Sequence, residues 1–244
     1  MVAGESRASD ETISLVLLPG LDGTGILFQP LIAALPPSIK PIVLSYPQDR
    51  HLTYHEFLPL VRERLPRDGP FIVLGESFSG PLAVMVAAER PAGLVGLILC
   101  ASFVVNPRPI IGTLFRFCVQ PFLFRLFPAL QRVKARIGGY STSELSRLFA
   151  QVHARVKPHV MAARPRMVFR VDVSDALRAC EVPVLYIAGG RDFVVPGRNL
   201  RVAQRIKPQM QSVTIDSPHM VLQTHPVEAS EAIVGFASSL SAIR

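Results

Sequence analysis

Short, mostly apolar runs typical of strands recur along this chain, and helical patterns or turns separate them. We identify these runs at residues 13–18, 41–46, 71–74, 94–101, 182–188 and 212–215. Between two of them, Phe57, Val61 and Leu65 recur at the spacing of one helix face. Strands that are apolar throughout and alternate with helices are typical of a parallel sheet covered on both faces. The pattern therefore predicts an α/β fold, with a mostly parallel sheet of about six strands and helices on both faces.

The alternation of strands and helices stops between residues 101 and 173. This stretch is helical in pattern, rich in Phe, Leu and Arg, and interrupted by prolines. We expect it to be an insertion that lies over the carboxyl edge of the sheet. The expected organisation is an α/β core of residues 12–102 and 172–244, with a helical, basic cap insertion at residues 103–171, hereafter the cap segment.

The charge of the chain is unevenly distributed. The chain has 26 Lys and Arg against 18 Asp and Glu, a formal charge of +8. The cap segment holds 12 of the basic residues and one acid, Glu144, so the whole basic excess lies there. Two interpretations stay open: solvated arginines that cover amphipathic helices, or a surface that faces an anionic partner. Because the segment is rich in phenylalanine and lacks a nucleic-acid-binding motif, nucleic acid is the less favoured partner.

The cysteines and the apolar runs bear on the compartment. Cys100, Cys118 and Cys180 are odd in number and lack C-x-x-C spacing, which favours reduced thiols. No run of about 18 uncharged apolar residues indicates a spanning helix, and the first twelve residues lack the apolar stretch of a secretory signal. We expect a cytoplasmic protein.

The hexapeptide Gly75-Glu76-Ser77-Phe78-Ser79-Gly80 lies between the strand at 71–74 and a helix that begins near Pro81. A serine on such a sharp turn exposes its hydroxyl beside the first free N–H groups of the helix. The turn requires small residues because strand and helix approach closely there. Compared with the pattern G-x-S-x-G, the second glycine position holds Ser79, with Gly80 one residue later.

A serine hydroxyl needs a base to take its proton and an acid to orient that base. Asp192 follows the strand at 182–188, and His219 follows the strand at 212–215, so both lie at the same sheet edge as Ser77. We consider other acids weaker candidates: Asp172 and Asp175 precede their strand, and Asp216 is too close in sequence to the histidine. The remaining histidines, which we expect at the surface or in the cap segment, are residues 51, 55, 153, 159 and 225.

The order Ser, Asp, His on three strand-to-helix loops resembles the α/β-hydrolase family, specifically its serine esterases with a helical cap. The resemblance covers residues 12–102 and 172–244. It implies that Ser77 is the nucleophile, His219 the general base and acid, and Asp192 its orienting partner. It also implies an oxyanion hole of two backbone N–H groups, from Phe78 and Leu21. The family's usual His-Gly before the second donor reads Pro19-Gly20 here, so the support of that loop must differ.

A serine nucleophile favours acyl transfer through an acyl-enzyme. We predict a carboxylesterase for a small-molecule ester with an apolar acyl chain, whose pocket includes Leu21, Phe78 and cap residues such as Phe115 and Phe122. One alternative is an acyl-carrier methyl esterase, thioesterase or acyltransferase that docks an acidic carrier protein, or an anionic lipid surface, by the basic cap. Another is a non-catalytic small-molecule binding protein on the same fold. The motifs imply neither a metal nor an organic cofactor.

Overall fold

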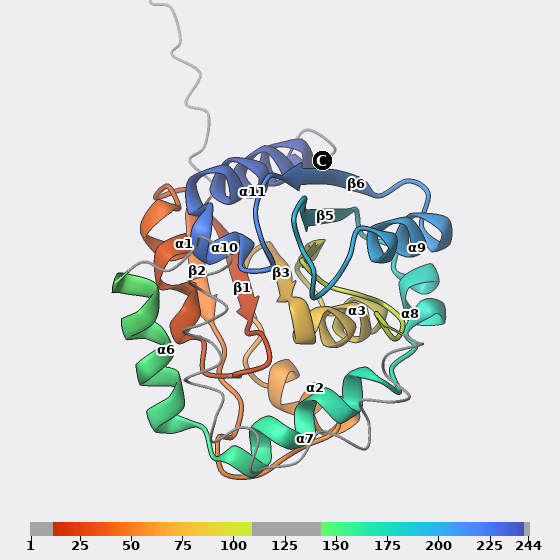
Figure 1. The fold of residues 1–244 in the computed structure, drawn as a ribbon. Helices are drawn as coiled ribbons and strands as arrows, with labels where there is room; N and C mark the ends of the chain where they lie inside the picture. Colours follow the sequence, from red (N-terminus) through yellow and green to blue (C-terminus); the bar gives the residue numbers. More distant parts are fainter. Residues whose placement is uncertain (1–11, 109–142, 242–244) are drawn as a thin grey trace, which may run out of the picture.

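The computed structural model describes residues 12–108 and 143–241, and its centre is a six-stranded parallel sheet (Figure 1). The strands are β1 (Ile13–Leu18), β2 (Ile39–Val43), β3 (Phe71–Glu76), β4 (Leu94–Cys100), β5 (Val184–Gly189) and β6 (Gln211–Ile215). They lie in the order β2-β1-β3-β4-β5-β6, and each neighbouring pair is parallel. The predicted α/β fold with a parallel sheet is confirmed.

Helices cover both faces of this sheet. The helices of the described residues are η1 (Ile26–Phe28), α1 (Gln29–Ala34), α2 (Tyr54–Arg62), η2 (Ser77–Ser79), α3 (Gly80–Ala88), α6 (Ser143–Arg155), α7 (Pro158–Val168), α8 (Ser174–Ala179), α9 (Arg198–Ile206), α10 (Val221–Thr224) and α11 (Pro226–Ser241). Among the described residues, α1, α10 and α11 pack on one face and α2, α3, α8 and α9 on the other. No helix within residues 12–108 and 143–241 is long and apolar enough to cross a membrane.

The continuous apolar character of the strands follows from this double covering. Side chains of a strand alternate between its two faces. In β1, Leu15 and Leu17 pack beneath α1 and α11, while Val16 and Leu18 pack beneath α2 and α3; all four are fully buried. A strand with one solvated face would show polar residues at every second position. The uninterrupted apolar runs therefore predicted the layers as well as the strands.

Two element boundaries differ from the sequence-based expectation. The sequence pattern of residues 221–240 predicts one closing helix, but α10 ends at Thr224 and α11 begins at Pro226. Proline lacks the N–H that would continue the first helix, yet it fits the first turn of the second. The strand expected at 41–46 spans Ile39–Val43, because Tyr46 N donates to Gly23 O, in the loop after β1, at 2.8 Å and not to a strand.

Helices α6 and α7 belong to the cap segment and lie at the left and lower edges of the view in Figure 1. Leu148, Val152 and Val160 of this segment form an apolar cluster with Ile26 and Leu27 of η1. Helices α6 and α7 therefore pack on the loop and turn that follow β1. The predicted pocket residues Phe115 and Phe122 lie outside the described residues, so their role stays a prediction.

The start of the cap segment lies beside the residues that directly follow its end. Val105 and Asp172 form an isolated antiparallel bridge, and Val173 N donates to Val104 O at 2.8 Å. The chain thus leaves the sheet after β4 and returns at nearly the same place before α8. The neighbouring strands β4 and β5 pair directly despite the long insertion between them.

Candidate active site

Ser77 lies on a strained turn between β3 and α3. Its φ is +47°, in the left-handed region that residues other than glycine rarely adopt. Glycines allow the close approach that this turn needs. A Cβ on Gly75 would lie 2.6 Å from the carbonyl oxygen of Ser79, and one on Gly80 would lie 1.7 Å from Ser102 Oγ. The Ser102 hydroxyl donates to the Ser77 carbonyl at 2.6 Å and so fixes the turn from the side of β4.

The serine at the second glycine position of the motif has a partner of its own. The Ser79 hydroxyl donates to the carbonyl oxygen of Pro19, and Tyr46 Oη lies 2.6 Å from Ser79 Oγ. Burial raises the pKa of Tyr46 well above its usual range, which keeps the phenol protonated as a donor. The loop that begins at Pro19 is therefore attached to the serine turn by a hydroxyl chain, which supplies the different support that the Pro19-Gly20 sequence requires.

The structure brings Ser77, His219 and Asp192 together. Ser77 Oγ lies 2.9 Å from His219 Nε2, and His219 Nδ1 lies 2.7 Å from Asp192 Oδ2. The Asp192 side chain is 1% exposed, and its other oxygen accepts the N–H groups of Val194 and Val195, each at 2.8 Å. These two bonds hold the carboxylate in one orientation, so the imidazole carries its Nδ1 proton toward the acid and presents Nε2 to the serine.

The weaker acid candidates lie elsewhere. Asp216 is exposed and pairs with Arg191, with Oδ1 and Nε 2.8 Å apart. Asp172 accepts the N–H of Ser174 at 2.9 Å at the start of α8. Asp175 is exposed and pairs with an arginine of its own helix. The structure thus supports Asp192, and none of these three, as the partner of the histidine.

Within the described residues, His159 and His225 have hydrogen-bond partners outside this cluster. His159 Nε2 lies 2.9 Å from the carbonyl oxygen of Asp49, and His225 Nδ1 lies 2.9 Å from Thr224 Oγ1 at the break between α10 and α11. Across residues 12–108 and 143–241, no group of three or more His, Cys, Asp or Glu residues is arranged to hold a metal ion.

The two residues predicted as oxyanion donors lie on the turns next to Ser77. Phe78 is the second residue of η2, where the first N–H groups of a helix have no partner within it. Its ring is buried and stacks on Tyr54 at 5.1 Å, and its carbonyl accepts the Tyr54 hydroxyl at 2.8 Å. Leu21 lies in a tight turn in which Gly23 N donates to Gly20 O at 3.0 Å.

A buried carboxyl group next to the serine was not singled out by the sequence analysis. Glu76 is 6% exposed, and burial raises its pKa to about 7, against a 2.8 Å hydrogen bond from Gln223 Nε2 that lowers it. A Cβ on Gly20 would lie 3.6 Å from Glu76 Oε2, so this carboxyl group also borders the loop after β1. The sequence did offer a signal for this group, because Glu76 is an acidic residue at the end of an otherwise apolar strand.

Arg164 of α7 was also missed, as one of twelve basic residues in the cap segment. It is fully buried. Its spacing was the sequence signal. Arg164 lies four residues after Val160 and three after Met161, and so on the apolar face of α7. Burial lowers the pKa of Arg164, while the nearby Asp22 carboxylate opposes that shift.

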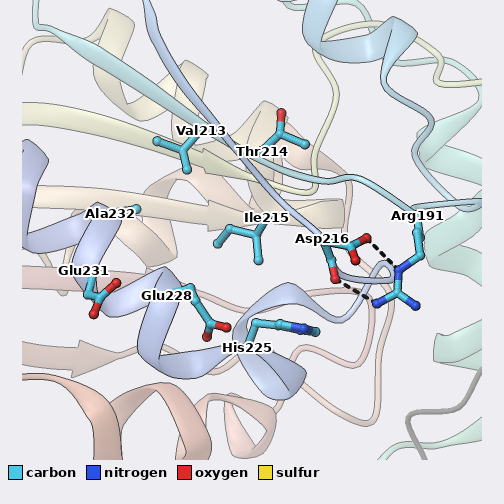
Figure 2. Close-up of a pocket in the computed structure, with 9 residues that line it drawn as sticks. All are labelled: Arg191, Val213, Thr214, Ile215, Asp216, His225, Glu228, Glu231 and Ala232. Carbon is cyan, nitrogen blue, oxygen red and sulfur yellow. Dashed lines mark hydrogen bonds and ion pairs between the residues drawn. The ribbon is translucent and has the colours of Figure 1, made fainter.

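A separate groove of about 550 Å³ lies beside β6 and α11 (Figure 2). Figure 2 shows Arg191 paired with Asp216 at one end of the groove, and Glu228 and Glu231 on the α11 side. Neither Ser77 nor His219 lines it. This groove is therefore distinct from the candidate active site.

A parallel sheet whose carboxyl edge joins a serine on a strained turn to a histidine and a buried aspartate defines the class of hydrolases built on an α/β sheet. The sequence comparison agrees with this class. The chain belongs to the alpha/beta hydrolase family, whose sequence profile matches residues 15–232.

Curated relatives match along nearly the whole chain. A pimeloyl-[acyl-carrier protein] methyl ester esterase of Xanthomonas oryzae pv. oryzae is 30% identical over 247 residues, covering 93% of this chain and 96% of the relative. The protein of the same name from Xanthomonas campestris pv. campestris is 28% identical over 248 residues, with the same coverage.

Solved structures share the fold. A thermophilic esterase from Thermogutta terrifontis has a TM-score of 0.75 at 20% identity, covering 93% of this chain and 90% of that chain. The enol-lactonase from Burkholderia xenovorans LB400 has a TM-score of 0.75 at 16% identity, covering 96% and 94%. At these identities the likeness extends to the fold alone.

Proposed function

We propose that this protein is a serine esterase that hydrolyses carboxylic esters through an acyl-enzyme intermediate. One observation carries the proposal: Ser77 Oγ, His219 and Asp192 form a continuous hydrogen-bonded chain, with steps of 2.9 Å and 2.7 Å. Both distances fall within the reach that proton transfer requires. Membership of the hydrolase family and the esterase relatives support the same activity.

In the proposed mechanism, Ser77 Oγ attacks the ester carbonyl carbon while His219 Nε2 takes the hydroxyl proton. The carbonyl oxygen becomes an oxyanion, which accepts hydrogen bonds from the N–H groups of Leu21 and Phe78. His219 then gives its proton to the departing alkoxide, so the alcohol leaves and the acyl group stays on Ser77. A water attacks this acyl-enzyme by the same steps and releases the acid. Asp192 orients the imidazole and stabilises its charged form throughout.

The acyl group that we propose is apolar. Leu21 and Met220, each part of a loop that carries a proposed catalytic group, pack against the apolar cluster of η1 and the cap segment. The two loops that carry these groups therefore present apolar side chains that pack against the helices of the cap segment. We propose that the cap segment contributes side chains to the wall of the acyl pocket, Phe115 and Phe122 among them.

The activity is tested by labelling with a fluorophosphonate and by hydrolysis of nitrophenyl esters of increasing chain length. We expect the wild type to be labelled once, Ser77→Ala to be unlabelled, and hydrolysis to favour longer apolar chains over acetate. A wild type that neither reacts nor hydrolyses any ester would refute the proposal and favour a non-catalytic binding protein. Preference for acetate would refute the apolar pocket alone.

A second candidate is hydrolysis of a methyl ester carried by an acidic acyl-carrier protein. The relatives named for that activity match 93% of this chain, and exposed cations of the cap segment include Arg147 and Arg155 on α6. We expect Arg147→Glu/Arg155→Glu to raise the KM for a carrier-linked methyl ester while leaving nitrophenyl ester hydrolysis unchanged. Arg201→Glu, an exposed change on α9, is the matched control.

Salt provides an independent test of carrier docking. Attraction between exposed charges is screened over about 8–10 Å at physiological ionic strength. Turnover of the carrier-linked ester should therefore fall between about 20 mM and about 500 mM NaCl, while turnover of a neutral nitrophenyl ester should not. Equal salt dependence of the two substrates would exclude docking by the basic cap.

A further inference from the structure

Arg164 is an arginine that the fold buries completely and surrounds with backbone carbonyl groups. Its Nη1 donates to the carbonyl oxygens of Leu21 and Asp22, at 2.8 Å and 2.6 Å. Its Nη2 donates to the carbonyl of Pro47 at 3.0 Å, and the guanidinium lies 5.9 Å from the centre of the Tyr46 ring. Charged side chains are rarely buried unless they are paired. Arg164 thus joins α7 to two loops of the core.

The first of these loops carries a proposed oxyanion donor. In the turn from Gly20 to Gly23, the Gly20 carbonyl accepts the Gly23 N–H at 3.0 Å, and Arg164 holds the next two carbonyls. A trans peptide group is planar, with its N–H and C=O pointing in opposite directions. The Leu21 N–H shares a peptide group with the Gly20 carbonyl. The direction of this N–H is therefore set by the bonds that fix the turn.

Space in the turn is matched to the guanidinium. Gly23 has a φ of +67°, and a Cβ there would lie 2.6 Å from Arg164 Nη1 and 2.9 Å from Cζ. A side chain at this position would displace the guanidinium from its carbonyl partners. The turn and the arginine therefore fit together as one unit.

The serine turn holds only the first part of the same loop. Ser79 fixes the Pro19 carbonyl, and the Glu76 carboxyl group borders Gly20. The next two residues, Leu21 and Asp22, take their carbonyl contacts from the cap segment through Arg164. The core and the cap thus share the support of one catalytic loop.

We propose that Arg164 is a positioning residue that sets the oxyanion donor of Leu21 from the cap segment. This inference rests on the proposed esterase function, because it assigns a role within the same reaction. Arg164 touches no reacting atom in this scheme. It acts through the turn, and the cap therefore contributes to the chemical step as well as to substrate binding.

The test compares Arg164→Met with Arg170→Met, an exposed arginine just beyond α7 that serves as the control. In hydrolysis of a nitrophenyl ester, Arg164→Met should reduce kcat roughly 10- to 100-fold and change KM by less than about 3-fold. The reason is that a misplaced donor stabilises the transition state less and leaves substrate binding unchanged. Arg170→Met should match the wild type. Rates are normalised to fluorophosphonate-reactive sites, so that unfolded protein does not enter kcat.

A trifluoromethyl ketone with the acyl chain of the substrate separates positioning from a merely structural role. Ser77 adds to this ketone and forms an oxyanion, whereas the corresponding trifluoromethyl alcohol binds without one. In Arg164→Met the ketone affinity should fall by about the same factor as kcat, and the alcohol affinity should stay constant. Equal losses for ketone and alcohol would assign Arg164 to the general architecture and overturn the proposal.

Arg164→Lys keeps the test valid if the methionine variant does not fold. It retains a cation near Asp22 but loses the planar guanidinium that donates to the carbonyl groups of two loops. We expect it to fold and to show an intermediate loss of kcat. A folded Arg164→Lys or Arg164→Met with wild-type kcat would overturn the inference while leaving the esterase proposal intact. A wild type without esterase activity would instead overturn the proposed function itself.

Discussion

The hydroxyl of Ser79 donates to the carbonyl oxygen of Pro19, and this bond joins the serine turn to the loop that follows β1. Both residues depart from the usual family pattern, which has a glycine where this chain has Ser79 and a histidine where it has Pro19. The side chain at the first of these positions bonds to the backbone carbonyl at the second. The hydroxyl of Tyr46, 2.6 Å from Ser79 Oγ, completes the chain.

Removal of this hydroxyl should affect both stability and rate. Ser79→Ala leaves the buried Pro19 carbonyl and Tyr46 hydroxyl without their partner, which costs about 1–3 kcal/mol in the free energy of unfolding. Because the loop also carries Leu21, kcat should fall roughly 3- to 10-fold. Urea unfolding and nitrophenyl ester kinetics measure the two effects. Ser238→Ala, an exposed change on α11, is the control, and equal behaviour of the two variants would contradict this account.

Asp192 and Asp216 offer a matched pair of carboxylates. Asp192→Asn should reduce kcat roughly 10²- to 10⁴-fold, because the amide no longer selects the tautomer that presents Nε2 of His219 to the serine. His219→Ala should reduce it further. Asp216→Asn, which alters only the exposed pair with Arg191, should leave kcat within about 2-fold of the wild type. A larger loss for Asp216→Asn than for Asp192→Asn would identify a different acid.

Two glycines in helices should respond oppositely to alanine. A Cβ at Gly80 would lie 1.7 Å from Ser102 Oγ and 2.7 Å from its Cβ, so Gly80→Ala should destabilise the fold by about 3 kcal/mol or more. A Cβ at Gly235 of α11 meets nothing within 4 Å. Gly235→Ala should therefore stabilise the protein by up to about 1 kcal/mol. Thermal unfolding of both variants checks the prediction, and destabilisation of Gly235→Ala would contradict it.

Glu76 should make stability depend on pH. Its pKa is about 7 in the folded protein, against an ordinary value of 4.5. Between these values the folded state keeps a proton that the unfolded chain releases, so the free energy of unfolding falls as the pH rises through this window. The fall should be on the order of 2–3 kcal/mol between pH 4.5 and pH 7, and nearly absent in Glu76→Gln.

The measurement is urea unfolding of the wild type and Glu76→Gln at several values from pH 5 to pH 8. Glu63→Gln, at an exposed glutamate just after α2, should keep the pH dependence of the wild type. A wild type whose free energy of unfolding changes over this range by the same amount as that of Glu76→Gln would show that the buried carboxyl group contributes nothing.

The sheet and the meeting of Ser77, Asp192 and His219 could be predicted because both follow from local pattern. Strands buried on both faces are continuously apolar, and the loops that follow parallel strands meet at one edge. The break at His225 was less visible, since Pro226 is equally compatible with a loop and with the first turn of a helix. The bonds of Ser79 and Arg164 could not be predicted, because each depends on a carbonyl group far away in the chain.

The bridge between Val105 and Asp172 brings the two points at which the insertion joins the core side by side. Since the insertion departs and re-enters at one spot, its replacement by a short turn, or by the corresponding piece of another enzyme, would demand no rethreading of the strands. Loop closure across such neighbouring points costs little and grows slowly with length. An exchange of residues 103–171 for another segment would therefore leave the order of the strands intact. If Arg164 has the proposed role, the replacement would also need a donor for the carbonyl groups of Leu21 and Asp22.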